Sequence, residues 1–176
     1  DSMPVSAQRT VNLYAQRQPP GTKSPVVVLG VPGIATWVSV GIGPIRGAHL
    51  MGGLLYVVSG AWLYSISNDP TPVKTQLGGQ ISGSGIVDMA DNGTQLMIVN
   101  GTNGYVYSTT AGFQLVTDGD FHAANTTTFL DSYFLFDWKG TNKFSRSDLL
   151  DGNNYDSLAF ASAESNSDNV LTVHAQ

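Results

Sequence analysis

The chain has 176 residues, a formal net charge of −5, 12% charged residues, 20 glycines and no cysteine. This length suits one domain with a sizeable core, and a chain without cysteine has no disulfide, thiolate nucleophile or Cys-ligated metal. The few Lys and Arg residues are scattered, which argues against sequence-specific nucleic-acid binding in a basic groove. The sequence contains no apolar run of 18 residues, so it predicts no membrane-spanning helix.

The first 43 residues form the predicted N-terminal region. Alternating apolar residues predict a strand at Arg9–Tyr14, and Pro19-Pro20-Gly21 places a loop at Gln16–Ser24 because proline disrupts a strand ladder. The continuous apolar run Pro25–Gly30 is typical of a strand buried on both faces. We expect one of these strands to be available to pair with the opposite end of the chain and close a ring.

From residue 44 onward, one pattern recurs about every 40 residues. In its clearest copy, short apolar runs are separated by Asn-Gly or Ala-Gly turns; the runs are Ile86–Met89, Gln95–Val99, Tyr105–Tyr107 and Phe113–Val116. Asn-Gly favours the positive φ angles of tight antiparallel hairpins. Leu55–Gly60 aligns with Leu96–Gly101 at an offset of about 41 residues, and Phe134–Phe136 follows Leu96–Ile98 by about 38. Four strands per unit at this period are typical of propeller blades.

The predicted fold class is therefore all-β: a partial β-propeller built from repeated four-stranded antiparallel blades of about 40 residues. The predicted units are about 44–84, 85–126 and 127–169, and Val170–His174 is predicted to be one strand of a fourth. We expect the chain to be the N-terminal part of a longer protein; the alternative is that another chain covers its open edges. A β-sandwich whose strands recur by chance is the alternative fold.

Short motifs follow one another along most of the chain in a specific order. They are Arg9-Thr-Val-Asn-Leu-Tyr14, Gly30-Val-Pro-Gly33, Ile45-Arg-Gly47, Leu55-Tyr-Val-Val58, Leu63-Tyr64, Gly83-Ser-Gly85, Val87-Asp-Met-Ala90, Phe144-Ser-Arg-Ser-Asp-Leu149 and Ala163-Glu-Ser165 with Asp168. This succession resembles the packaged-DNA stabilisation proteins, or tail accessory factors, of short-tailed bacteriophages. No single motif carries the resemblance; their order does.

The resemblance implies a structural virion component of the phage tail that is assembled in the bacterial host cytoplasm. Such a protein extends or plugs the DNA channel below the portal and stabilises packaged DNA. Its implied partners are the portal-bound adaptor, the tail needle, the tailspike and copies of itself in a ring, and no enzymatic activity is implied. Few Lys and Arg residues suit this role, because a basic wall would hold DNA phosphates and slow ejection.

The acidic and imidazole side chains are weighed as candidate metal ligands. His49 and His174 fall on predicted first strands of their units, so both are expected near one axis, and Asp88 is the only acidic residue on an equivalent strand. A metal site there would need further ligands, and satisfied or solvated histidines, His122 included, are the ordinary alternative. Asp118-Gly119-Asp120 lacks the alternating oxygens of a calcium loop and predicts a solvated turn. We predict no metal site.

Candidate catalytic and cofactor motifs also favour structural explanations. Ser147–Tyr155 resembles a degenerate Asp-box, a hairpin turn of sialidase propellers in which an acidic side chain binds the turn's own amides. Only Arg46 and Arg9 are placed for a sialidase arginine triad. Gly83-Ser84-Gly85 lacks the residues around a nucleophile elbow, and Gly41-Ile42-Gly43 lacks the third glycine of a dinucleotide site. We predict no catalytic or cofactor-binding residue and no cofactor.

The alternative function is a non-catalytic propeller or sandwich module that binds glycans as an adhesin. Its candidate stacking platforms are Trp37, Trp62, Trp138, Tyr56, Tyr64, Tyr105 and Tyr107. Aromatic residues on strands more often form the core of a blade. Burial between blades is expected of a scaffold, whereas solvent-facing pockets at a rim are expected of a lectin. Of the sequons, Asn92 and Asn100 are interpreted as hairpin turns, and Asn125 lies in a polar loop.

Overall fold

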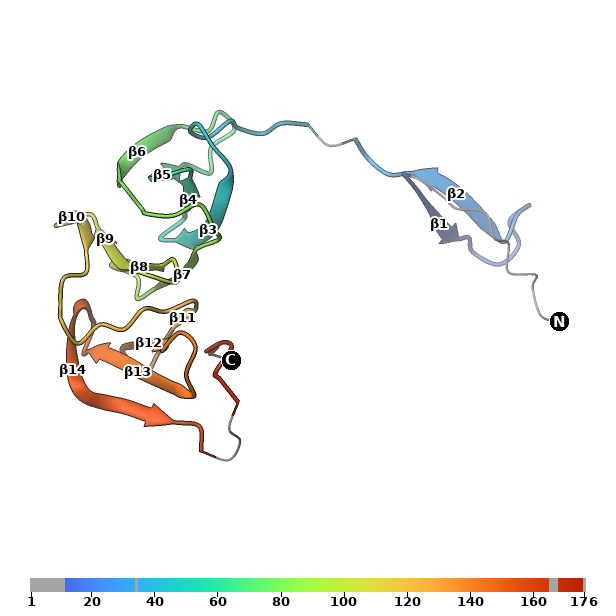
Figure 1. Ribbon diagram of the computed structural model, residues 1–176. Coiled ribbons are helices and arrows are strands. Elements are labelled where there is room, and N and C mark those ends of the chain that lie inside the picture. Colours follow the sequence, from blue (N-terminus) through green and yellow to red (C-terminus); the bar gives the residue numbers. More distant parts are fainter. Residues whose placement is uncertain (1–11, 34, 165–167, 176) are drawn as a thin grey trace. The chain divides into compact units, whose positions relative to one another are not determined.

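The computed structural model describes residues 12–33, 35–164 and 168–175 (Figure 1). Contacts divide the chain into two compact units, and the boundary falls between Trp37 and Val38. All regular secondary structure in the described ranges is β, in 14 strands. Within those ranges, no helix is long and apolar enough to cross a membrane. The all-β prediction is confirmed.

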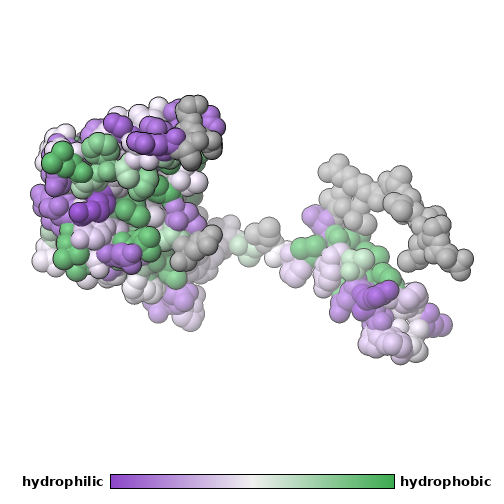
Figure 2. Space-filling model, turned by 90° about the horizontal axis from the view of Figure 1, so that it is seen from below, coloured by the Kyte–Doolittle hydropathy of each residue, from purple (hydrophilic) through white to green (hydrophobic). Residues whose placement is uncertain are grey.

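Unit 1 contains one antiparallel hairpin, β1 (Leu13–Arg17) and β2 (Val26–Gly30), in which Leu13 pairs with Gly30. The predicted strand Arg9–Tyr14 is described only from residue 12 onward. Strand β1 continues through Arg17, so the predicted start of the loop at Gln16 is wrong. The predicted burial of Pro25–Gly30 on both faces is also wrong, because Val28 is 53% exposed. Among the described residues of this unit, neither face has a covering sheet, and Figure 2 shows its apolar surface in green.

Unit 2 contains three four-stranded antiparallel sheets, each with its strands adjacent in chain order. Sheet 1 comprises β3 (Ile45–Met51), β4 (Leu54–Ser59), β5 (Trp62–Ile66) and β6 (Lys74–Gly79). Sheet 2 comprises β7 (Asp88–Asp91), β8 (Gln95–Val99), β9 (Gly104–Ser108) and β10 (Gly112–Leu115). Sheet 3 comprises β11 (Thr127–Leu130), β12 (Tyr133–Asp137), β13 (Lys143–Asp148) and β14 (Asp151–Ser162). The predicted repetition of four-stranded antiparallel units is confirmed.

The predicted glycine turns have the backbone conformation that the sequence requires. Gly93, Gly101 and Gly112 have φ angles of 85°, 81° and 74°, a region that side chains rarely tolerate. The amide oxygen of Asn92 accepts hydrogen bonds from the backbone N–H groups of Thr94 and Gln95, at 2.9 and 2.7 Å. The side chain of Asn92, the first residue of the first sequon, therefore stabilises a hairpin turn, as predicted.

The three sheets stack on one another. First strands lie next to first strands, β3 against β7 and β7 against β11, while the outer strand β6 lies against β10 (Figure 1). The side chains of β8 alternate between the two interfaces: Leu96 and Ile98 face sheet 1, whereas Met97 and Val99 face sheet 3, and all four are fully buried. Sheet 2 is thus the centre of the core, with an apolar cluster on each side.

The two clusters have different members. Cluster 1, between sheets 1 and 2, holds Met51, Tyr56, Val58, Leu63, Ile81, Val87, Met89, Leu96, Ile98, Tyr105 and Tyr107. Cluster 2, between sheets 2 and 3, holds Ala90, Met97, Val99, Val106, Val116, Ala124, Phe134, Phe136 and Tyr155, with Phe121, Phe129 and Trp138 packed against it.

The predicted final strand, Val170–His174, does not form in the structure. The backbone N–H groups of Val173 and Ala175 instead donate to the hydroxyls of Thr126 and Thr128, at 3.1 and 3.2 Å. Because side-chain oxygens take these donors, no backbone ladder forms with β11. The sheets described here do not close into a ring, and a fourth unit and the number of blades stay predictions.

Candidate functional site: the groove along the first strands

A groove of about 610 Å³ is lined by the first strands of all three sheets and by residues 172–174. Its polar side chains include His49 of β3, Asp88 and Asp91 of β7, and His174. The structure therefore places His49, Asp88 and His174 along one groove, although His174 does not lie on the strand that the expectation required. Among the residues that the structure describes, no lysine or arginine lines this groove.

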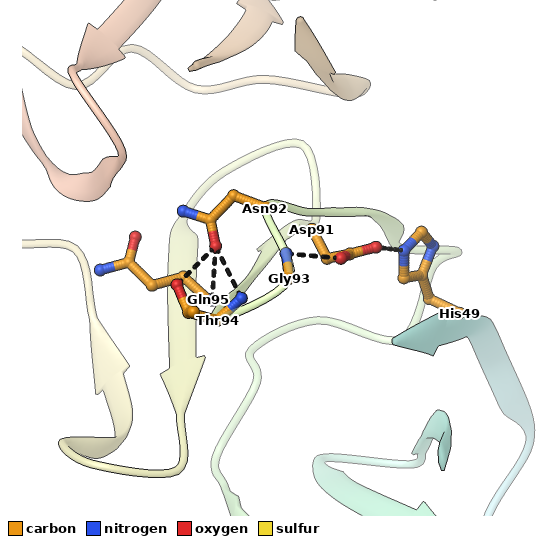
Figure 3. Close-up of polar contacts among 6 residues, drawn as sticks. All are labelled: His49, Asp91, Asn92, Gly93, Thr94 and Gln95. Carbon is orange, nitrogen blue, oxygen red and sulfur yellow. Dashed lines mark hydrogen bonds and ion pairs between the residues drawn. The ribbon is translucent and has the colours of Figure 1, made fainter. Parts of the chain in front are cut away.

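Alternation along β7 sends its two carboxylates to opposite neighbours. Asp91 points towards sheet 1, where its Oδ2 lies 2.6 Å from Nε2 of His49, while its Oδ1 accepts the N–H of Gly93 at 2.8 Å (Figure 3). Asp88 points towards sheet 3, and its Oδ2 accepts the N–H of Thr127 at 2.9 Å. Both carboxylates therefore bind the first strand of an adjacent sheet, which links the three sheets around the groove.

The groove offers little to a metal ion. In the described part of the chain, no group of three or more His, Cys, Asp or Glu side chains is placed to hold a metal. One ring nitrogen of His49, Nε2, is already paired with the carboxylate of Asp91. His122 lies elsewhere, stacked on Trp138 with ring centroids 3.5 Å apart. The chemistry available in the groove is hydrogen bonding and weak negative charge.

Arg46 is buried at 5% exposure, and backbone carbonyls occupy its guanidinium. It donates to the carbonyl oxygens of Gly85 at 2.6 Å, Ser82 at 2.9 Å, Gly60 at 3.0 Å and Ile81 at 3.1 Å. Desolvation by burial lowers the pKa of Arg46. The second arginine weighed for a sialidase triad, Arg9, lies outside the described residues. Arg46 thus holds the connector between sheets 1 and 2 in place. Its Nε, Nη1 and Nη2 atoms all donate to backbone carbonyls, so the guanidinium is not available for bidentate binding of a ligand.

The Asp-box-like turn has a structural geometry. Oδ1 of Asp151 accepts the N–H of Asn153 at 2.9 Å, and Oδ2 accepts the side-chain amide of Asn154 at 2.6 Å. Burial raises the pKa of Asp151, but the hydrogen bonds from Asn153, Asn154 and Gln95 outweigh it and leave that pKa below its ordinary value. The hydroxyl of Tyr155 donates to the carbonyl of Gly152 at 2.5 Å, inside cluster 2.

The second acidic motif is also a turn. Oδ1 of Asp118 accepts the N–H of Asp120 at 2.9 Å, and Oδ2 accepts the N–H of Tyr155 at 3.0 Å. One carboxylate therefore closes its own loop and also binds sheet 3 to the loop that follows sheet 2. This is the solvated turn predicted for these residues, with an added contact between sheets that the sequence did not indicate.

Three of the seven candidate stacking aromatics lie in the core, whereas Trp37 is 52% exposed and Tyr64 is half-buried. Tyr56, Tyr105 and Tyr107 are buried in cluster 1. Trp138 is partly buried, and His122 covers its ring. Trp62 is 38% exposed on sheet 1. Among the surface pockets found in the described part of the chain, one is lined by Tyr56 and none brings two of these rings together.

Asp137 is a structural residue that the sequence analysis missed. It is fully buried at the end of β12, and its Oδ1 accepts the N–H groups of Asn125 and Thr126, at 2.9 and 2.7 Å. The Thr126 hydroxyl also donates to it at 3.0 Å. The available signal was a carboxylate that ends an otherwise apolar strand and precedes a tryptophan. A charged group in such apolar surroundings is expected to need hydrogen-bond donors from the protein.

Comparison with known families gives one extensive match. A family model described as "Bacteriophage P22 Gp10, beta-propeller" matches residues 5–176. A search of curated proteins gives no match. The family match agrees with the order of motifs along the chain and with the repeated four-stranded sheets. The chain therefore belongs to the P22 Gp10 family of DNA stabilisation proteins, which are structural proteins of bacteriophages.

Proposed function

We propose that this chain is part of the wall of a phage tail, where it extends or plugs the DNA channel below the portal and stabilises packaged DNA. The observation that carries the proposal is the family match over residues 5–176. We infer a mechanical role without catalysis. The three sheets are consecutive blades of a propeller, and the protein is assembled into virions in the host cytoplasm.

The links between sheets support a mechanical role. Arg46, the His49–Asp91 pair and the Asp88–Thr127 bond each join one sheet to its neighbour or to the connector between them. Such bonds give a wall resistance to shear, because buried polar groups that separate must find new partners. A part that holds DNA under pressure needs this rigidity.

The chemistry of the groove supports a wall that does not bind DNA tightly. Its lining combines hydroxyls of Thr126 and Thr128 with the carboxylates of Asp88 and Asp91, and it contains no cationic Lys or Arg. Phosphate contacts with cations supply most nonspecific affinity for DNA. A surface without them lets DNA pass.

Partners of the proposed wall are the portal-bound adaptor, the tail needle, the tailspike and further copies of the chain in a ring. A low charge density and 20 glycines suit a β scaffold dense in turns. The glycan-binding alternative predicts aromatic rings in solvent-facing pockets, whereas Tyr56, Tyr105 and Tyr107 pack between sheets. The burial of these rings favours the scaffold.

The proposal is tested on phage particles assembled with and without the protein that contains this chain. Particles without it are expected to release packaged DNA, measured as nuclease-sensitive DNA over time, and supply of the protein in trans is expected to restore retention. Particles that retain DNA equally well in both cases would contradict the proposal. A glycan array probed with the same protein tests the adhesin alternative, and selective sugar binding would support that alternative.

A further inference from the structure

The hairpin of unit 1 exposes more apolar surface than a two-stranded sheet can keep in water. Leu13, Tyr14 and Val28 are 45%, 47% and 53% exposed, and Val26 is 38% exposed. Leu13, Val26 and Val28 lie on one face by register, while Tyr14 lies on the other. A lone hairpin is marginally stable in water, and strands with open edges readily pair with further strands. Both its faces and its edges call for a partner.

The charges of the two units are complementary. Residues 1–37 contain Arg9, Arg17 and Lys23 against Asp1, a formal charge of +2. Residues 38–176 contain five Lys or Arg against twelve Asp or Glu, a formal charge of −7. The partner that best fits the hairpin is therefore an acidic surface such as that of unit 2, because opposite charges steer and align association.

Within unit 2, β14 offers an edge that suits such a strand. It is the terminal strand of sheet 3 and has 12 residues, against four in β10, the terminal strand of sheet 2. Leu158 and Phe160 are 81% and 41% exposed on it. Asp156 and Glu164, next to these apolar residues, are also exposed. This edge combines backbone N–H and C=O groups that a further strand can pair with, exposed apolar side chains and negative charge.

We propose that the hairpin of one copy adds to the free edge of β14 in a second copy of the chain. Main-chain hydrogen bonds supply the affinity of such an addition, and side chains supply its register. Val28 lies near Leu158 in the proposed contact, and Arg17 and Lys23 lie near the acidic residues of the β14 edge. The proposal rests on the self-association included in the proposed function, and it names the two surfaces that meet.

The length of the linker favours a second copy over the same copy. Sheet 1 holds the first residues of unit 2, since Ser59 Oγ donates to the Val40 carbonyl at 3.0 Å and Lys74 Nζ to the Ser39 carbonyl at 2.9 Å. Only residues 31–37 lie between β2 and unit 2, and they span at most about 25 Å. Sheet 3 is two sheet spacings away, about 20 Å through sheet 2 and more around it, so docking within one copy would require an almost fully extended linker.

Disulfide trapping tests the proposal, because the chain has no cysteine of its own. The full chain is made as Val28→Cys and, separately, as Leu158→Cys, and the two proteins are mixed under mild oxidation. Disulfide-linked heterodimers are expected at several times the yield of either homodimer. A mixture that gives only Val28→Cys homodimers would show that hairpins pair with one another, and would overturn the proposal.

Intramolecular docking is tested with the double variant Val28→Cys/Leu158→Cys at low protein concentration. A crosslink between copies is expected, detected as a dimer on denaturing gels. A crosslink within one chain would overturn the proposal in favour of the same copy. Ile86→Cys, at an 86% exposed position of unit 2 before β7, replaces Leu158→Cys as the matched control and is expected to give no heterodimer above background.

Sedimentation of the full chain measures the strength of the contact. Leu158→Lys is expected to weaken self-association at least tenfold, whereas Ile86→Lys leaves it unchanged. Oligomers that persist unchanged in Leu158→Lys would overturn the proposed contact while leaving self-association intact. A chain that stays monomeric at every concentration tested would overturn the proposed contact and self-association together. DNA retention by phage particles is a separate measurement, so a failure of the tail function is distinguishable from either result.

Discussion

The two interfaces of sheet 2 achieve the same stacking with different side chains at their connectors. On the side of sheet 1, cluster 1 is made of aliphatic residues and tyrosines, and a buried guanidinium, that of Arg46, binds backbone carbonyls. On the side of sheet 3, cluster 2 is rich in phenylalanine, and buried or half-buried carboxylates, such as Asp137 and Asp118, bind backbone amides. A connector that exposes carbonyls calls for a cation, and one that exposes amides calls for an anion.

This difference shows that the repeat constrains the pattern of the strands more tightly than it constrains the polar contacts that join one sheet to the next. Each sheet needs apolar faces at a period of two, so the same alternation recurs in β4, β8 and β12. The loops between sheets differ in length and conformation, and each is held by whichever charged group reaches it. The two interfaces should therefore respond differently to substitution and to pH.

The largest expected effect is on cluster 2. Phe136→Ala removes a fully buried ring that packs against Phe121 and Tyr155, with centroids 5.2 Å away in each case. The cavity is expected to lower the free energy of unfolding by about 3–5 kcal/mol. Denaturant unfolding of the full chain measures the change. The control Leu115→Ala, at a position that is 49% exposed, is expected to change it by less than about 0.5 kcal/mol.

The next effect is on the cation that fastens cluster 1. Arg46→Met keeps the apolar stem but leaves the carbonyls of residues 60, 81 and 85 without their side-chain donor, while the carbonyl of Ser82 keeps only the amide of Asn100, so a loss of about 3 kcal/mol is expected. Arg46→Lys is expected to recover only part of this stability, because an ammonium lacks the planar fork. Full recovery by lysine, measured by the same unfolding experiment, would show that charge alone holds the connector.

Much of this architecture is readable from the sequence, because short periods and turn residues act locally. Asn92-Gly93 and the apolar run Gln95–Val99 predict a hairpin and its strand, and both form. The contacts that join the sheets could not be predicted from the sequence, because Arg46 binds carbonyls of residues 14 to 39 positions away in the chain. Asp137 likewise shows its role only when residues 125 and 126 reach it.

Errors of prediction arose where neighbours decide the outcome. The run at Pro25–Gly30 is apolar enough for two-sided burial, but in the described residues of unit 1 the strand beside it is β1 alone. Val170–His174 has the composition of a strand, yet threonine hydroxyls accept the N–H group of Val173 and that of Ala175, the next residue along the chain. The groove was partly anticipated, since first strands of successive units were expected to converge, whereas the pairing of His49 with Asp91 depends on the register between sheets.

A third prediction concerns how closely β3 and β7 approach in cluster 1. A Cβ atom added to Gly47 would lie 2.7 Å from a methyl group of Val87 and 2.8 Å from its carbonyl oxygen. Gly47→Ala is therefore expected to push the sheets apart and cost about 1–3 kcal/mol. Gly119→Ala is the matched control, since its Cβ would meet nothing within 4 Å. Equal unfolding midpoints for the two variants would contradict the close approach.

The smallest expected effect is the contribution of Asp151 to stability, which is expected to depend on pH, unlike that of Arg46. The pKa of Asp151 is lowered in the folded chain, so its contribution to stability is present above the ordinary value of 3.8 and is lost as pH falls through the lowered folded value. Asp151→Asn is expected to be less stable than the native chain near pH 6, and the difference is expected to shrink towards about pH 3.

Arg46→Met provides the comparison for cluster 1, because a guanidinium keeps its charge over this whole range. Its loss of stability relative to the native chain is expected to stay constant where that of Asp151→Asn shrinks. Unfolding curves of the three proteins at about five pH values between about 3 and about 6 measure both differences. Parallel pH dependence of the two variants would mean that the contacts of Arg46 and of Asp151 respond to pH in the same way, which would contradict the predicted difference between the two interfaces.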